Sequence, residues 1–148
     1  MPSTHTSLHC HVTFATKSRN PWIRADIRSR VHEYIGGCLL RHGAQPLIVG
    51  GVEDHVHLLF GFAPSVCISD LMHDVKKPVT DWIRAEFGVR EFTWQEGFGA
   101  FTVSRSALDR VQEYITTQEE HHRHVTFQEE YLLLLQRHGI AYDERYLW

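Results

Sequence analysis

Apolar residues along the chain recur with two different spacings, and their order predicts a mixed α+β fold. Short runs of β-branched, aromatic and aliphatic residues bounded by turn residues are typical of strands, whereas apolar positions every three or four residues indicate helices. The predicted strands are 8–16, 45–52, 55–62 and 98–104, and the predicted helices are 23–42, 69–87, 107–122 and 126–138. This order is βαββαβ followed by two helices. It predicts a ferredoxin-like antiparallel sheet with helices on one face, extended by C-terminal helices.

Turn and capping residues refine these elements. Gly50-Gly51 interrupts the apolar run between the second and third strands, which predicts a hairpin. Pro78 lies inside the helix predicted over 69–87 and predicts a kink or a break there. Ser106 is placed to cap the helix that follows the last strand.

Length and composition favour one domain spanning 1–148. The chain has 148 residues, 43% of them hydrophobic, which suffices for one sizeable core. No run of about 20 apolar residues occurs, and the first residues lack the plan of a signal peptide, so we expect a soluble cytoplasmic protein without a membrane partner. The three cysteines are widely spaced and odd in number, which predicts reduced thiols.

The distribution of charge is informative in only one segment of the chain. The formal net charge of −3 does not indicate a nucleic-acid binder. Residues 17–30, however, contain five basic residues and one acid, and they include an aromatic ring that could stack on an unpaired base. Trp22 could equally belong to the core. The candidate DNA-binding residues here are Lys17, Arg19, Trp22, Arg24 and Arg28, and those elsewhere are Lys76, Lys77 and Arg105.

The first candidate for chemistry is Asp54-His55-Val56-His57-Leu58-Leu59. Within a strand, alternate residues share a face, so His55 and His57 would lie together while Val56 and Leu58 point to the core. Two rigidly held imidazoles can bind one divalent ion. By itself the motif is equally compatible with a polar strand surface. Asp54 could assist the ion, although capping the turn into the strand explains it more simply.

The second candidate is Tyr114-Ile115-Thr116-Thr117-Gln118 in the helix predicted after the last strand. A spacing of four places Tyr114 and Gln118 on one helical face. Spacing alone is also compatible with an ordinary amphipathic surface.

Together these motifs resemble the single-tyrosine HUH transposases, which include small insertion-sequence transposases and REP-associated tyrosine transposases. The resemblance covers nearly the whole chain, and Phe127 with Glu129-Glu130 and the closing Tyr146-Leu147-Trp148 resemble the REP-associated branch in particular. The stretches that carry it are His11–Lys17, Asp54–Leu59, Trp94–Phe101 and Tyr114–His122.

The resemblance implies a function and roles for these residues. It implies that His55, His57 and Gln118 hold Mg²⁺ or Mn²⁺, and that Tyr114 is the nucleophile. Attack on single-stranded DNA would give a 5′-phosphotyrosine intermediate that a DNA hydroxyl can later reverse. The implied partners are hairpin or palindromic DNA ends and a second copy of the chain in a homodimer. The stretch Lys76-Lys77-Pro78-Val79-Thr80 departs from the family pattern, because small hydroxyl residues usually follow the lysine.

Two other functions remain open at this point. A domesticated relative could bind palindromic repeats without moving them, and a metal-dependent hydrolase could use His55 and His57 with water while Tyr114 takes no part.

His121, His122 and His124 are interpreted as polar surface or DNA-facing residues, because neighbouring helical residues point about 100° apart. Leu132–Leu135 is interpreted as packing surface.

Overall fold

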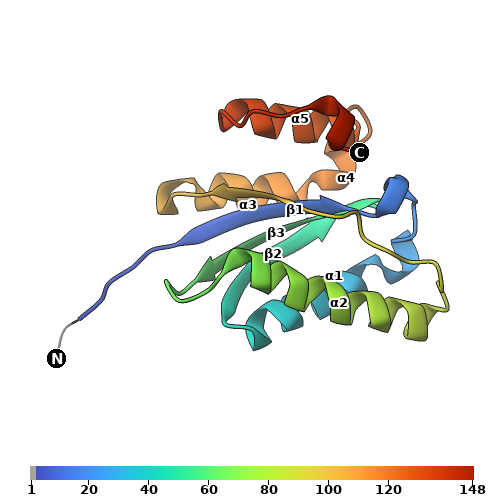
Figure 1. Cartoon of the computed structure of the whole chain (residues 1–148), viewed down its shortest axis with the longest axis horizontal. Coiled ribbons are helices and arrows are strands. Elements are labelled where there is room, and N and C mark those ends of the chain that lie inside the picture. The colour runs from blue at the N-terminus through green and yellow to red at the C-terminus, as the bar shows by residue number, and fades with distance from the viewer. Residues whose placement is uncertain (1–2) are drawn as a thin grey trace.

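The computed structural model describes residues 3–148 and contains a four-stranded antiparallel sheet (Figure 1). Its strands are β1 (His9–Ala15), β2 (Ala44–Gly51), β3 (His55–Phe62) and β4 (Gly99–Thr102). Their order is β2-β3-β1-β4. Both central strands pair antiparallel with their neighbours. This topology confirms the predicted ferredoxin-like α+β class.

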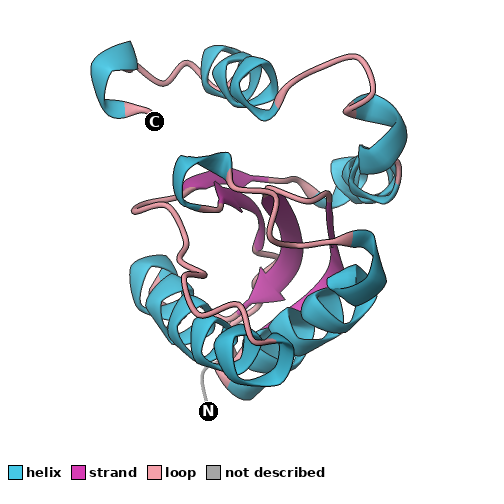
Figure 2. Cartoon of the chain, turned by 90° about the vertical axis from the view of Figure 1, so that its right-hand side faces the viewer, coloured by secondary structure: helices cyan, strands magenta, loops and turns pink. Residues whose placement is uncertain are grey.

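Two long helices cover one face of the sheet. They are α1 (Ala25–Arg41) and α2 (Ile68–Phe87), and Figure 2 shows them side by side beneath the strands. Side chains such as Val12, Phe14 and Phe60 pack against them in the main core. The break predicted at Pro78 is wrong, since α2 runs through that residue. Buried apolar side chains on both sides of the proline hold the helix on the sheet and outweigh the lost backbone hydrogen bond.

The C-terminal third of the chain covers the opposite face (Figure 2). It contains α3 (Leu108–Thr116), α4 (Gln118–His121) and α5 (Phe127–Arg137). Short 3-10 turns are η1 (Lys17–Arg19), η2 (Arg105–Ala107) and η3 (Glu144–Tyr146). Because α3 ends at Thr116 and α4 begins at Gln118, the single helix predicted over 107–122 is interrupted at Thr117. Ser106 lies in η2 and bonds the Ser104 hydroxyl instead of capping a helix.

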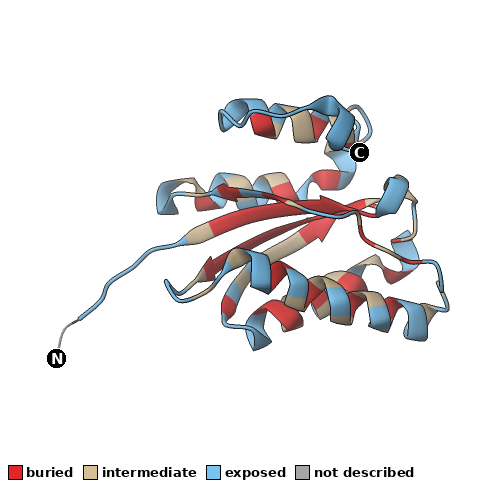
Figure 3. Ribbon diagram, viewed as in Figure 1, coloured by how far each residue is buried: buried red, intermediate tan, exposed pale blue. Residues whose placement is uncertain are grey.

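One glycine allows α3 to lie close to the sheet. A Cβ at Gly50 would come within 2.6 Å of Ile115 Cγ2 and 2.7 Å of the Ile115 carbonyl oxygen. Ile115 joins Leu59 and Leu108 in a small second core between α3 and the sheet. Helical layers on both faces thus bury the central strands, as the burial colours of Figure 3 show.

The remaining sequence expectations concern cysteines and membranes. Cys10 and Cys38 are buried and Cys67 is exposed, all three as free thiols. Among the described residues, no helix combines the length and apolarity needed to cross a bilayer.

Candidate active site

His55 and His57 lie on the face of β3 that α3, α4 and α5 cover. Val56 and Leu58 point to the main core on the other side, as the alternating pattern predicts. Both imidazoles are fully buried, with 0% exposure. The histidine pair is therefore an enclosed site and not a polar strand surface.

Two further side chains orient these imidazoles. His55 Nδ1 lies 2.7 Å from Asp54 Oδ1, and His57 Nδ1 lies 2.8 Å from His11 Nε2 on the neighbouring strand β1. A hydrogen bond at Nδ1 fixes the ring and leaves Nε2 as the available ligand atom. Asp54 therefore has more than a capping role, and the sequence analysis missed His11.

The structure brings Tyr114 and Gln118 to the same histidines. Gln118, 1% exposed, accepts a hydrogen bond through Oε1 from His55 Nε2 at 3.2 Å. The Tyr114 ring lies edge-on to His57, with 5.7 Å between ring centroids. One chain thus supplies all four residues that the resemblance implicates.

The structure adds a carboxylate from α5 that the sequence analysis did not select. Glu130 is 2% exposed, and its Oε1 lies 2.9 Å from His57 Nε2 and 3.4 Å from His55 Nε2. Its Oε2 accepts hydrogen bonds from the Tyr114 hydroxyl and, at 3.2 Å, from Gln118 Nε2. Glu130 therefore contacts the two histidines, the tyrosine and the glutamine together.

The interpretation of His122 as a surface or DNA-facing residue is wrong, whereas the side chain of its neighbour His121 is 29% exposed. Both place Nε2 3.3 Å from Glu130 Oε2, and the His122 side chain is only 8% exposed. The turn after α4 brings the two rings to one carboxylate despite their different helical directions. His55, His57, His122 and Glu130 have ligand atoms within 4.8 Å of one another and could hold a metal ion. We call these four residues the histidine–glutamate cluster.

The protonation of these groups depends on how burial and hydrogen bonding compete. Burial lowers the pKa of His55, but the hydrogen bonds with Asp54 and Glu130 outweigh it and raise the pKa to about 9. For His57 burial dominates, and the pKa falls below its ordinary value. Burial would raise the pKa of Glu130, yet the surrounding imidazoles hold it well below the usual range.

Tyr114 is a weak nucleophile in this arrangement. Burial first, and then the adjacent negative charge of Glu130, raise the pKa of its hydroxyl above its ordinary value. A phenol must lose its proton to attack a phosphate efficiently. Activation therefore needs a positive charge near the phenol oxygen or a change in the position of Glu130.

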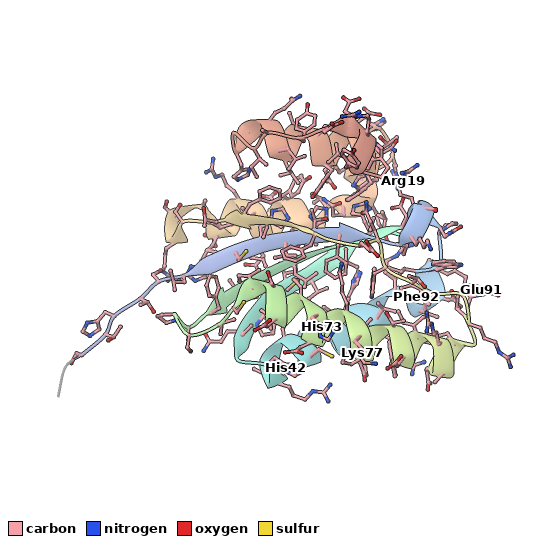
Figure 4. The ribbon with its side chains drawn as sticks, viewed as in Figure 1. Arg19, His42, His73, Lys77, Glu91 and Phe92 are labelled. Carbon is pink, nitrogen blue, oxygen red and sulfur yellow. The ribbon has the colours of Figure 1, made fainter. Side chains whose placement is uncertain are left out.

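Lys76 is not free to contact a DNA backbone in this structure. Its Nζ donates hydrogen bonds to the carbonyl oxygens of Gln95 (3.0 Å) and Gly97 (2.5 Å) and lies 4.7 Å from the centre of the Phe14 ring. Burial lowers its pKa to about 8. Lys77 is exposed on the outer side of α2 (Figure 4) and pairs loosely with Asp81 at 3.6 Å.

The other candidate DNA-binding residues do not form one patch. Trp22 is half-buried and packs on Phe92, with 5.5 Å between ring centroids, and Arg28 bonds Glu119 at 2.8 Å. Arg24 and Arg105 are exposed at separate places, on the loop before α1 and in η2.

Lys17 and Arg19 lie beside the C-terminal segment. They line a cavity of about 380 Å³ together with Trp94, Phe127 and Trp148. The Arg19 guanidinium lies 6.0 Å from the centre of the Trp148 ring. This cavity joins positive charge and aromatic rings, the combination expected for binding unpaired bases.

Comparison with known proteins identifies the family of this chain. The family model described as "Transposase IS200 like" matches residues 4–118. The chain belongs to this transposase family. No functionally curated protein matches it.

Two solved structures share the fold of this IS200-like transposase. A candidate transposase from Deinococcus radiodurans matches with a TM-score of 0.66 at 21% identity, over 80% of this chain and 95% of the other. A REP-associated tyrosine transposase bound to a REP hairpin matches with a TM-score of 0.61 at 13% identity, over 84% of this chain and 76% of the other. The family match ends at Gln118, so α5 and Glu130 lie beyond it.

Proposed function

We propose that this transposase cleaves and rejoins single-stranded DNA through Tyr114, with Mg²⁺ or Mn²⁺ held by His55, His57 and Gln118. The donor set fits such an ion, because two imidazole nitrogens and an amide oxygen converge in a buried site. The two imidazoles are also oriented by hydrogen bonds with Asp54 and His11. When bound, the ion would polarise the scissile phosphate and stabilise the charge that develops during attack.

The chemistry of the chain's own residues is a reversible transesterification. The Tyr114 oxygen forms a bond to phosphorus, the P–O3′ bond breaks, and the products are a 5′-phosphotyrosine link and a free 3′-hydroxyl. The proton of Tyr114 must leave, and Glu130 Oε2 already accepts its hydrogen bond. A DNA 3′-hydroxyl can reverse the step without ATP, because the phosphotyrosine link keeps the energy of the phosphodiester bond.

One observation carries this proposal. Tyr114 approaches the His55–His57 pair within a single chain, and both share contacts with one carboxylate. A metal-dependent hydrolase would have no need of a tyrosine at this position. The nucleophile and the ion site are therefore best explained as parts of one centre.

The proposed substrate is single-stranded DNA with hairpin or palindromic ends. It is supported by the family, by the hairpin bound to the REP-associated transposase, and by the basic and aromatic cavity near Arg19. The resemblance also predicts a homodimer, although the candidate centre does not need a second chain.

The test is covalent capture of labelled single-stranded DNA from the sequences that flank the gene. We expect a protein–DNA adduct on a denaturing gel with Mn²⁺, and none with Tyr114→Phe, His57→Ala or a chelator. Tyr131→Phe is the matched control, because this tyrosine packs on Phe127 and does not contact the histidine pair. An adduct that survives in Tyr114→Phe would rule out the assigned nucleophile.

A repeat-binding protein without transposition activity is the second candidate. It is favoured by the complete burial of both histidines beneath the C-terminal layer, which leaves no room for a phosphate in this conformation. This function predicts tight hairpin binding by gel shift without an adduct under any divalent metal.

A further inference from the structure

Glu130 is a buried carboxylate surrounded by groups that commonly bind metals. It is 2% exposed, its Oε1 contacts His55 and His57, and its Oε2 contacts Gln118, His121 and His122. Burying a carboxylate is expensive unless a positive charge or a metal compensates for it. Such a side chain in the first turn of α5 therefore needs a compensating partner.

The ligands implied by the family resemblance leave the charge of an ion uncompensated. Two imidazoles and an amide are neutral donors, whereas a buried dication is stabilised by anionic ligands. Glu130 is the carboxylate that contacts these donors, and oxygen ligands are those that Mg²⁺ and Mn²⁺ favour.

A second observation points to the same place. The buried His122 Nε2 atom faces Glu130 Oε2 at 3.3 Å, while its Nδ1 contacts the Val125 carbonyl oxygen at 2.6 Å. A ring held through Nδ1, with Nε2 directed at a carboxylate, has the arrangement of a metal-ligating histidine.

We propose that Glu130 is a direct ligand of the ion and that this bond holds α5 in its position over Tyr114. His122 would complete the set from the adjoining turn. This inference rests on the proposed function, because it concerns the same ion, but it adds ligands from the C-terminal segment beyond Gln118. With an ion bound in this way, Glu130 and His122 would hold the C-terminal segment over Tyr114.

The alternative is that Glu130 occupies the place of the ion and competes with it. The two arrangements predict opposite effects of removing the carboxylate. As a ligand, Glu130 increases affinity for the ion, whereas as a competitor it decreases that affinity.

Calorimetric titration of the full chain with Mn²⁺ distinguishes them. We expect Glu130→Gln to weaken Mn²⁺ binding about tenfold or more, since even changes to outer-shell partners of metal ligands cost about 10–100-fold. Glu129→Gln is the matched control, because Glu129 is exposed one position earlier on α5 and a glutamine there preserves its contact with Thr126. Unchanged or tighter binding in Glu130→Gln overturns the inference.

Hydrogen exchange of the wild-type protein gives a readout that needs no variant. If Glu130 is a ligand, Mn²⁺ slows amide exchange in residues 127–137, whereas displacement of Glu130 by the ion accelerates it.

His57→Ala distinguishes a failure of the proposed function from a failure of the role assigned to Glu130. Loss of binding in His57→Ala with full affinity in Glu130→Gln overturns only the role of Glu130, whereas absence of Mn²⁺ binding in the wild type overturns the ion and this inference together.

Discussion

At the scale of single residues, His11 determines how His57 presents its nitrogen atoms. It is buried at 4% exposure, and burial together with the nearby His57 lowers its pKa to about 3, so it is neutral near pH 7. A neutral His11 can accept a hydrogen bond from His57 Nδ1–H, which leaves His57 Nε2 free for an ion, or donate one to His57 Nδ1 when His57 Nε2–H bonds Glu130. His11 is therefore a positioning residue for the histidine pair.

Substitution of His11 by leucine tests this positioning role. We expect Mn²⁺ affinity to fall about 10–100-fold, the range for outer-shell partners of metal ligands. Calorimetry measures the affinity, and His124→Ala is the control because His124 is exposed. Equal affinities for the two variants would contradict the assigned role.

His32 predicts a loss of stability in mild acid that is independent of the active site. It lies on α1, its Nε2 is buried without a partner, and burial followed by the charge of Arg28 lowers its pKa from 6.5 to about 4. The unfolded chain binds this proton more readily, so the contribution of neutral His32 is present above pH 6.5 and is lost as pH falls toward 4.

Urea denaturation at pH 7.5 and 4.5 measures this effect. We expect His32→Gln to reduce the difference in unfolding free energy between the two pH values by about 1–3 kcal/mol, because each pKa unit corresponds to about 1.4 kcal/mol. His73→Gln, at an exposed position of α2, should leave the difference unchanged. An unaltered pH dependence in His32→Gln would show that this ring does not contribute.

At the scale of secondary-structure elements, the close approach of α3 to β2 places Tyr114 and Gln118. Gly50→Val would force Cβ against Ile115 and push α3 outward. We expect a destabilisation of about 1–3 kcal/mol by thermal or urea unfolding, typical of overpacking, together with reduced adduct formation. Gly36→Ala in α1 is the control, since nothing lies within 4 Å of its added Cβ and the helix should gain about 0.5–1 kcal/mol.

Lys76 connects α2 to the loop that precedes β4, and its role is structural. Its bonds to the Gln95 and Gly97 carbonyl oxygens predict that Lys76→Met destabilises the fold by about 1–3 kcal/mol, the range for hydrogen bonds from a charged donor. Lys77→Met should change stability by less than about 0.5 kcal/mol, as exposed substitutions do. Chemical denaturation compares the two. Similar stabilities would instead favour a phosphate-binding role for Lys76.

The sequence predicted the parts of the site that local periodicity controls. Alternation along β3 placed His55 and His57 on one face, and helical spacing placed Gln118 near Tyr114. Glu130 escaped notice because Glu129 and Glu130 both look like acids in the first turn of a helix, where negative charge is generally favourable. Only the path of the chain after α4 decides which of the two reaches the histidines. The contacts of Lys76 are hidden from the sequence for a similar reason, since its partners are backbone atoms about twenty residues away.

At the scale of the whole molecule, the structure predicts that a single chain assembles the candidate centre. Tyr114 reaches Glu130 and the histidine pair without a partner subunit, because α3 packs on its own sheet through Leu59, Leu108 and Ile115. A homodimer is compatible with this arrangement, but exchange of the tyrosine helix between subunits is not required.

Mixing two inactive variants tests assembly within one chain. Tyr114→Phe retains the histidines and His57→Ala retains the tyrosine, so a helix-swapped dimer of the two would contain one complete centre. With assembly in one chain, the mixture forms no adduct even after the two variants are denatured and refolded together. Dilution of the wild type with Tyr114→Phe under the same conditions is the control, and adduct formation should fall in proportion to the wild-type fraction. Recovery of adduct in the variant mixture would mean that the tyrosine acts across subunits, and that the arrangement seen in one chain is a resting form from which α3 must move.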